Sequence, residues 1–261
     1  MEQALLEALT ALASDSHSGA MEIAAQGADL ITRRARTSAA QDSDALRQEL
    51  LDIGWGLIRA HPTMAPLVNL VNNVLWKVER VATPPMMQRS AAEAAQEFKR
   101  QLHVHEAAIA ERALALIPEG GRVLTNGRST TVRAALRYAQ RAGRRFKVVC
   151  AESRPACEGR ELAAELAESG IATVLLTDAR ATASIAEVQV VLVGADHLTH
   201  LQLVNKAGTY GLALACAAAE VPIYALCSSE KFLPPRVSAA TAGAVAGRAS
   251  LGGSAPWCDD R

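Results

Sequence analysis

Five short apolar segments, separated by helical patterns, set the strongest limit on how this chain can fold. They cover residues 122–125, 146–150, 172–176, 188–193 and 222–226. The patterns between them, at residues 130–142, 158–169, 181–186 and 209–219, have the spacing of helices. Strands that alternate with helices predict a parallel sheet of βαβ units. Nearly continuous apolar strands agree, because helices cover such strands on both faces.

The first 117 residues follow a different pattern, in which apolar residues recur at helical spacing and almost no strand signal occurs. Proline, glycine and serine residues interrupt this pattern, and a turn at residues 118–121 ends it. We therefore predict an α/β protein with a helical N-terminal domain, residues 1–117. A Rossmann-like parallel-sheet domain, residues 118–236, follows it, and residues 237–261 form an irregular tail.

Charge and composition exclude several classes of partner. The chain has 27 basic and 27 acidic residues, and 3% of it is aromatic, which disfavours a nucleic-acid-binding protein. The N-terminus is acidic and too mildly apolar for a signal peptide, and no apolar run approaches the roughly 18–20 residues of a membrane helix. The five cysteines form no CxxC pair. We expect a cytoplasmic protein with no nucleic acid and no membrane as partner.

Polar residues follow four of the predicted strands, and the carboxyl ends of parallel strands are where such sheets bind ligands. Asn126 and Gly127 follow the first strand, and the glycine allows the backbone to approach a ligand closely. Ser129 or Thr130 could contact a phosphate or simply cap the next helix. The sequence leaves both roles open.

Two further strand ends carry charged residues. Arg154 follows the second strand and could hold a phosphate with two hydrogen bonds, or it could pair with Glu152. Asp178 follows the third strand and is equally suited to a ligand hydroxyl and to a helix cap. These residues are candidates, each with a structural alternative.

The fourth strand end is the most informative, in the sequence VVLVGADHLTHLQLVNKAGTY at residues 190–210. It offers the carboxylate of Asp196, the ammonium of Lys206 and the start of a helix, which favours an anion. Asp196 is the candidate general acid or base. The alternative is a structural ion pair between Asp196 and Lys206.

Histidines in this chain do not predict a metal site. His197 and His200 are three residues apart and His103 and His105 two apart, with no further ligand at metal spacing. We expect neither a metal nor another cofactor.

Four segments of the sequence resemble one protein superfamily. They are VLVGADHL with VNKAGTYGLALACAAAEVPIYAL, AESRPACEGRELAAELAESGIATVLLTDA, LTNGRSTTVRAAL and HPTMAPLVNLVNNV, within residues 15–232. The superfamily holds the α, β and δ subunits of eukaryotic translation initiation factor 2B, methylthioribose-1-phosphate isomerase and archaeal ribose-1,5-bisphosphate isomerase. The block that contains Asp196 and Lys206 is the most specific of the four.

The resemblance implies a site and a reaction. In the isomerases a sugar phosphate is opened, and its C2 proton is moved to make a 1-phosphorylated ketose. The aspartate of the acid/base pair matches Asp196. The substrate-binding positions implied by the match are Gly19, Ala20, Asn126, Gly127, Ser129, Arg154, Asn205 and Lys206.

Three departures from the isomerase pattern bear on activity. The catalytic cysteine of the isomerases aligns with Gly127, and two of their arginines align with Ser18 and His61. Cys150, at the end of the neighbouring strand, is a candidate substitute for the cysteine. We expect a protein that binds a sugar phosphate of the ribose-1-phosphate type, either as an aldose-ketose isomerase with altered acid/base residues or as a non-catalytic regulatory or assembly subunit. The resemblance also implies a homodimer formed through the C-terminal domain.

Overall fold

The computed structural model describes residues 3–15 and 17–233. The predicted tail, residues 237–261, lies outside the described residues. The chain divides into two compact units. Of the described residues, the first unit contains those up to Val104, residues 197–200 and residues 230–233, and the second contains residues 105–196 and 201–229. The predicted domain boundary at residue 118 stays a prediction.

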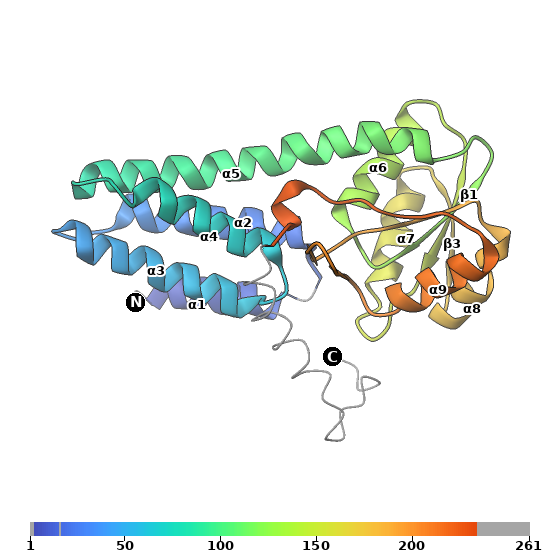
Figure 1. Ribbon diagram of the computed structural model, residues 1–261, viewed down its shortest axis with the longest axis horizontal. Helices are drawn as coiled ribbons and strands as arrows, with labels where there is room; N and C mark the ends of the chain where they lie inside the picture. Colours follow the sequence, from blue (N-terminus) through green and yellow to red (C-terminus); the bar gives the residue numbers. More distant parts are fainter. Residues whose placement is uncertain (1–2, 16, 234–261) are drawn as a thin grey trace, which may run out of the picture. The chain divides into compact units, whose positions relative to one another are not determined.

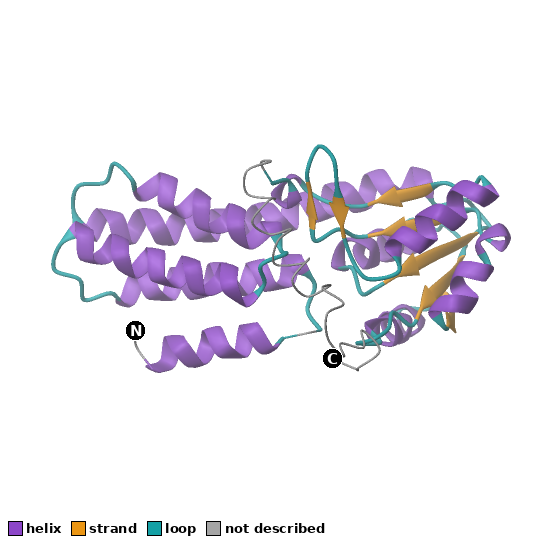
Figure 2. Cartoon of the chain, turned by 60° about the horizontal axis from the view of Figure 1, so that its bottom comes forward, coloured by secondary structure: helices purple, strands orange, loops and turns teal. Residues whose placement is uncertain are grey.

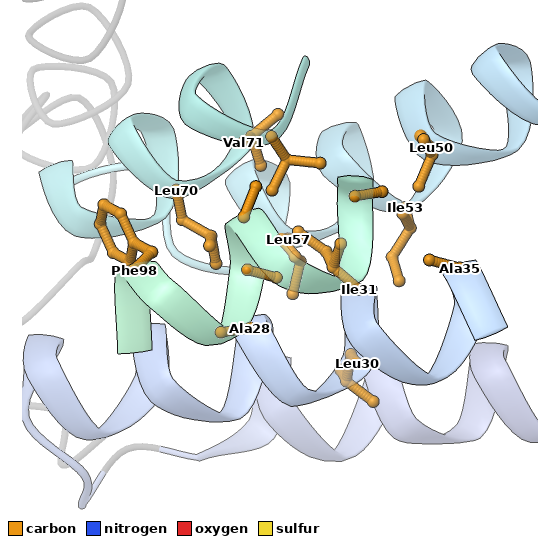
Figure 3. Close-up of a cluster of buried hydrophobic side chains, with 14 of the residues drawn as sticks. Ala28, Leu30, Ile31, Ala35, Leu50, Ile53, Leu57, Leu70, Val71 and Phe98 are labelled. Carbon is orange, nitrogen blue, oxygen red and sulfur yellow. The ribbon is translucent and has the colours of Figure 1, made fainter. Parts of the chain in front are cut away.

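The first unit is built from helices, as the apolar spacing predicts (Figures 1 and 2). They are α1 (Gln3–Ser14), α2 (Ala20–Thr37), α3 (Ser43–Ala60), α4 (Ala65–Val78) and the first part of α5 (Pro84–Ala113). Side chains from α2, α3, α4 and α5 meet in one buried apolar cluster, which includes Ile31, Leu57, Leu70 and Phe98 (Figure 3). None of the helices in the described part of the chain is long and apolar enough to cross a membrane.

The second unit contains a five-stranded sheet in the order β3-β2-β1-β4-β7, with every neighbouring pair parallel. Its strands are β1 (Arg122–Asn126), β2 (Lys147–Ala151), β3 (Ala172–Leu176), β4 (Val190–Val193) and β7 (Ile223–Ala225). Its helices are α6 (Thr130–Arg141), α7 (Glu158–Glu168), α8 (Asp178–Ala183) and α9 (Thr209–Ala219). The predicted fold class is therefore confirmed.

Alternate residues of the strands enter two separate apolar clusters, one on each face of the sheet. Val123 and Val148 pack with residues of α6 and α7, whereas Leu124 and Val191 pack with residues of α8 and α9. Both faces of the sheet are therefore covered (Figure 2). This burial explains why the strands read as nearly continuous apolar runs.

The strand order reverses direction between β1 and β4. From β1 the chain continues to β2 and β3 on one side, and then returns to place β4 on the other side of β1. In the register of β1 and β4, Asn126 lies opposite Val193, so the residues that follow the two strands leave the sheet at the same edge. Such a switch point is where open α/β sheets bind ligands. The segments after Asn126 and Val193 are the ones that carry the sequence candidates.

Two short strands, β5 (His197–Leu198) and β6 (Leu203–Val204), and three single turns of 3-10 helix at Leu114–Leu116, Ile185–Glu187 and Ser229–Lys231 complete the described elements. The sequence did not predict β5 and β6, because two residues are too few to show an alternating pattern.

Candidate functional site

The turn from β1 into α6 forms the centre of the candidate site. Gly127 has a φ of +80°, a left-handed conformation that glycine adopts without strain. Ser129 is the N-cap of α6, where its side chain accepts a hydrogen bond from the N–H of Val132 at 3.3 Å. The capping role of Ser129 is thus present in the structure, and its predicted contact with a phosphate stays a prediction.

The loop after β2 is held by Asp178. Its two carboxylate oxygens accept hydrogen bonds from the backbone N–H groups of Ser153 (2.7 Å) and Arg154 (2.8 Å). Thr177, and not Asp178, is the N-cap of α8. Asp178 therefore fixes the path of the neighbouring loop, a third role beside the ligand contact and the helix cap that the sequence suggests.

Ser153 connects this loop to the β1 turn. Its Oγ accepts a hydrogen bond from the N–H of Gly127 at 2.7 Å, and its hydroxyl lies within donating distance of Asn126 Oδ1 (2.8 Å) and Ala151 O (3.0 Å). The other end of the Asn126 amide donates from Nδ2 to the carbonyl of Ala207 at 2.9 Å. Both ends of the Asn126 side chain thus join the turn to neighbouring loops.

The segment after β4 lies directly against the same turn. A Cβ placed on Gly194 would be 2.6 Å from Ser129 Oγ and 3.7 Å from Asn205 Oδ1, so only glycine fits there. Asn205 Nδ2 donates to Thr209 Oγ1, and the Thr209 hydroxyl donates to the carbonyl of Lys206. These bonds shape the chain just before α9. The close approach at Gly194 brings the segment that carries Asp196 to the N-cap of α6.

Lys206 forms an ion pair with Glu158, the first residue of α7, and not with Asp196. The Lys206 Nζ and Glu158 Oε1 atoms are 2.6 Å apart, and both side chains are largely buried. The suggestion that Lys206 forms an ion pair with Asp196 is therefore wrong. A Cβ on Gly127 would lie 3.4 Å from Lys206 Cβ and 4.0 Å from Glu158 Oε1. The missing side chain at residue 127 thus faces the first methylene groups of Lys206 and a carboxylate oxygen of Glu158.

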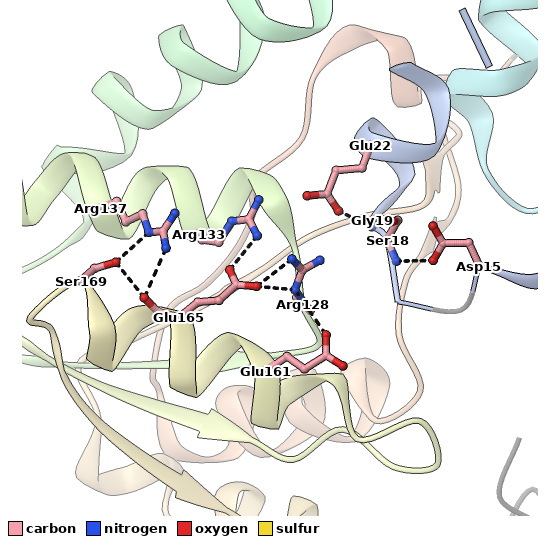
Figure 4. Close-up of polar contacts among 10 residues, drawn as sticks. All are labelled: Asp15, Ser18, Gly19, Glu22, Arg128, Arg133, Arg137, Glu161, Glu165 and Ser169. Carbon is pink, nitrogen blue, oxygen red and sulfur yellow. Dashed lines mark hydrogen bonds and ion pairs between the residues drawn. The ribbon is translucent and has the colours of Figure 1, made fainter. Parts of the chain in front are cut away.

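A second charged group lies beside the turn. Glu165 on α7 accepts hydrogen bonds from Arg128 (2.8 Å) and Arg133 (2.6 Å), and Glu161 lies 3.7 Å from Arg128 (Figure 4). Burial opposes ionisation of Glu165, but the hydrogen bonds from the two arginines outweigh it and hold the pKa of Glu165 below its usual range. This cluster ties α6 and the β1 turn to α7.

Arg154 is exposed, and its Nη1 lies 3.7 Å from Cys157 Sγ. The suggestion that Glu152 forms an ion pair with Arg154 is wrong, because Glu152 forms its ion pair with Arg160 at 2.8 Å. The contact of Arg154 with a phosphate stays a prediction.

Cys150 does not fit the part of a substitute acid. Its side chain is fully buried, and that burial raises the pKa of the Cys150 thiol to about 12. A thiol with such a pKa does not exchange a proton near neutral pH. The candidate role of Cys150 is therefore not supported by its surroundings.

Four positions of the resemblance, Ser18, Gly19, Ala20 and His61, lie in the helical unit. The N–H of Gly19 donates to Glu22 Oε2 at 3.1 Å, and the N–H of Ser18 donates to Asp15 Oδ1 at 2.8 Å (Figure 4). His61 Nε2 lies 2.7 Å from the carbonyl oxygen of Leu12. Local contacts thus occupy these groups, and the role of Gly19 and Ala20 in substrate binding stays a prediction.

A family model described as the initiation factor 2 subunit family matches residues 16–242. This chain belongs to that family. The ribose 1,5-bisphosphate isomerase of Archaeoglobus fulgidus is 30% identical to this chain over 232 residues. The aligned residues cover 88% of this chain and 72% of the isomerase. The methylthioribose-1-phosphate isomerase of Gemmatimonas aurantiaca is 35% identical over 199 residues, 72% of this chain and 57% of the relative.

The family fold is also that of a solved structure. The crystal structure of translation initiation factor eIF-2B from Pyrococcus horikoshii matches this chain with a TM-score of 0.80 and 32% sequence identity. The match covers 90% of this chain and 82% of the initiation factor chain. The recognition made from the sequence is therefore confirmed. The family includes proteins named for isomerase activity and proteins named for initiation, so membership alone leaves the activity open.

Sequence reasoning about the family pattern missed two residues of the site, Ser153 and Glu158. Ser153 has a φ of +67°, and no local pattern signals that its hydroxyl reaches Gly127. Glu158 precedes Gly159, at which a Cβ would overlap the carbonyl oxygen of Ala151. Gly159 was the signal that the sequence offered, because a glycine at the start of a helix can indicate close approach to a neighbouring strand. Here the start of α7 lies directly against the end of β2.

Proposed function

We propose that this protein binds a phosphorylated sugar of the ribose-1-phosphate type and isomerises it from aldose to ketose with altered acid/base residues. One observation carries the proposal: the segment with Asp196 and Lys206 is packed against the β1 turn at the switch point. Lys206 lies beside Gly127, and Gly194 lies beside Ser129. The relatives named as isomerases supply the class of substrate.

The chemistry of these groups suits a sugar phosphate. The N-termini of α6 and α9 follow the two segments, and helix N-termini favour the negative charge of a phosphate. Lys206 adds a positive charge. In this proposal Asn126, Ser129, Arg154 and Asn205 contact the ligand, and Asp196 exchanges protons with the sugar as general acid or base.

A non-catalytic regulatory or assembly subunit is the second candidate. Gly127 favours it, because this position has no side chain to donate or accept a proton. The similarity to a protein named as an initiation factor is consistent with it. In both cases we propose a cytoplasmic homodimer formed through the C-terminal domain, with a small phosphorylated metabolite as ligand and neither nucleic acid nor a membrane as partner. Light scattering of the purified protein tests the dimer.

A thermal-shift assay with ribose 1-phosphate, ribose 1,5-bisphosphate and 5-methylthioribose 1-phosphate tests binding. A sugar at 100 times its Kd should stabilise the protein by about 2.7 kcal/mol, which corresponds to a rise in Tm of roughly 5–11 °C. Turnover is followed by proton NMR, which distinguishes the 2-ketose from the starting sugar.

Asp196→Asn should lower kcat by about 10²–10⁴-fold, whereas Asp52→Asn, at an exposed position of α3, should leave it unchanged. Binding without turnover of any of the three sugars would favour the non-catalytic candidate. No shift and no turnover with all three would contradict both candidates as sugar-phosphate proteins.

A further inference from the structure

Gly127 leaves the proposed isomerase short of one acid/base group, and the structure contains a carboxyl at that place. We propose that Glu158 is the second acid/base residue of this protein, acting together with Asp196. The inference rests on the proposed isomerase function. It assigns a catalytic role to a residue for which the family resemblance implied none.

The position of Glu158 is the first argument. Glu158 Oε1 lies 4.0 Å from the point where a Cβ of residue 127 would be. A side-chain acid attached at residue 127 would occupy the space next to that carboxylate. The start of α7 thus brings the carboxylate of Glu158 to the space that a side chain on the β1 turn would enter from the other side.

The way in which Glu158 is held is the second argument. The residue is 9% exposed, and Lys206 Nζ at 2.6 Å compensates the charge of Oε1. The second oxygen, Oε2, is buried and has no hydrogen-bond partner among the described residues. A carboxylate that only stabilises the fold has both oxygens satisfied, since an unpaired buried oxygen is costly. Glu158 therefore keeps a capacity to accept a proton that the fold does not use.

The position is also rigid, as an acid/base group requires. The N–H of Gly159 donates to the carbonyl of Glu152 at 3.2 Å, and the absence of a Cβ on Gly159 lets α7 begin against the end of β2. Asp178 holds the preceding loop through Ser153 and Arg154. The start of α7 is thus fixed on both sides of Glu158.

The isomerisation needs two groups that exchange protons. As the bond between C1 and the ring oxygen breaks, the ring oxygen takes one proton, and C2 gives one proton to a base, which leaves a C1–C2 double bond. C1 then takes a proton and the C2 hydroxyl loses one, which gives the 2-ketone and returns both protein groups to their starting states. We assign these transfers to Asp196 and Glu158 as a pair.

The test compares four proteins: wild type, Glu158→Gln, Glu158→Asp and, as a matched control, Glu168→Gln, which changes an exposed acid on the same helix. Turnover of the same three sugar phosphates in D₂O is followed by proton NMR, and Kd is measured by calorimetry. Glu158→Gln keeps the volume of the side chain and removes its acid/base function. We expect kcat to fall by about 10²–10⁴-fold, Kd to stay within about threefold, and Glu168→Gln to match the wild type.

Glu158→Asp keeps a carboxyl but withdraws it by one methylene, so we expect turnover that is reduced at least about tenfold and still detectable. This variant tests the assignment if Glu158→Gln does not fold. A kcat within threefold of the wild type in either variant would overturn the role of Glu158 while the isomerase function stood. A loss of turnover explained entirely by weaker binding would also overturn it. A wild type that neither binds nor converts any of the sugars would overturn the proposed function, and the role of Glu158 with it.

Discussion

The contact between the start of α7 and the end of β2 predicts a large effect for Gly159→Ala. A Cβ at this position would overlap the carbonyl oxygen of Ala151 and lie 2.9 Å from its carbonyl carbon and 3.0 Å from Ser153 Oγ. Ordinary contacts begin at 3.4 Å, so the carbonyl carbon alone would have to move by 0.5 Å (3.4 − 2.9) and its oxygen by more. The obstacle is backbone at the end of β2, a strand that is hydrogen-bonded to β1 and β3 and cannot rotate away.

Overpacking of a well-packed site costs typically about 1–3 kcal/mol, and the backbone obstacle places Gly159→Ala at the upper end. For a protein of this size, 1 kcal/mol corresponds to about 2–4 °C in Tm. We therefore expect Tm to fall by roughly 6–12 °C, measured by differential scanning calorimetry.

Gly211→Ala is the matched control, because Gly211 also lies in the first turn of a helix and has no atom within 4 Å of its Cβ position. Removing a glycine at such a site stabilises a protein by about 0.4–1 kcal/mol, so this Tm should rise by a few degrees. Equal melting temperatures for the two variants would refute the argument from close approach.

Two further predictions follow from the pKa shifts of Glu165 and Cys150. Because the pKa of Glu165 is lowered in the folded state, its bonds to Arg128 and Arg133 stabilise the protein fully above the unfolded pKa, and this stabilisation is lost as pH falls through the folded pKa. Between pH 6 and pH 3 the urea midpoint of the wild type should therefore fall more than that of Glu165→Gln, and parallel curves would contradict this. With a pKa of about 12 and no exposure, Cys150 should resist iodoacetamide at pH 8 while Cys157 reacts, as read by mass spectrometry; rapid labelling of Cys150 in the folded protein would count against the assigned burial.

The strands and helices of this protein could be predicted closely because each carries its own local pattern. The run at residues 172–176 coincides with β3, and the pattern at residues 209–219 coincides with α9. The order of the strands could not be predicted, because the position of β4 beside β1 depends on how helices cover the two faces of the sheet. No residue pattern within a single strand records that choice.

The contacts among the candidate residues were harder to predict than the strand ends that carry them. The segments after β1 and β4 meet at one edge of the sheet, as the sequence predicts, yet Asp196, the acid nearest to Lys206 in the sequence motif, is not its ion-pair partner. Glu158 is 48 positions away (206 − 158) and reaches Lys206 at 2.6 Å because α7 starts against β2. Asp178 is a similar case, since its two bonds to the backbone of the neighbouring loop depend on the pairing of β2 with β3.

The hydroxyl of Ser153 has a consequence for how this site changes during evolution. It binds the backbone N–H of residue 127, and every residue type except proline has that N–H. The turn can therefore exchange its side chain without losing its anchor. We expect sequences of the family to show residues 127 and 158 varying together, while residue 153 keeps a hydroxyl side chain across the change.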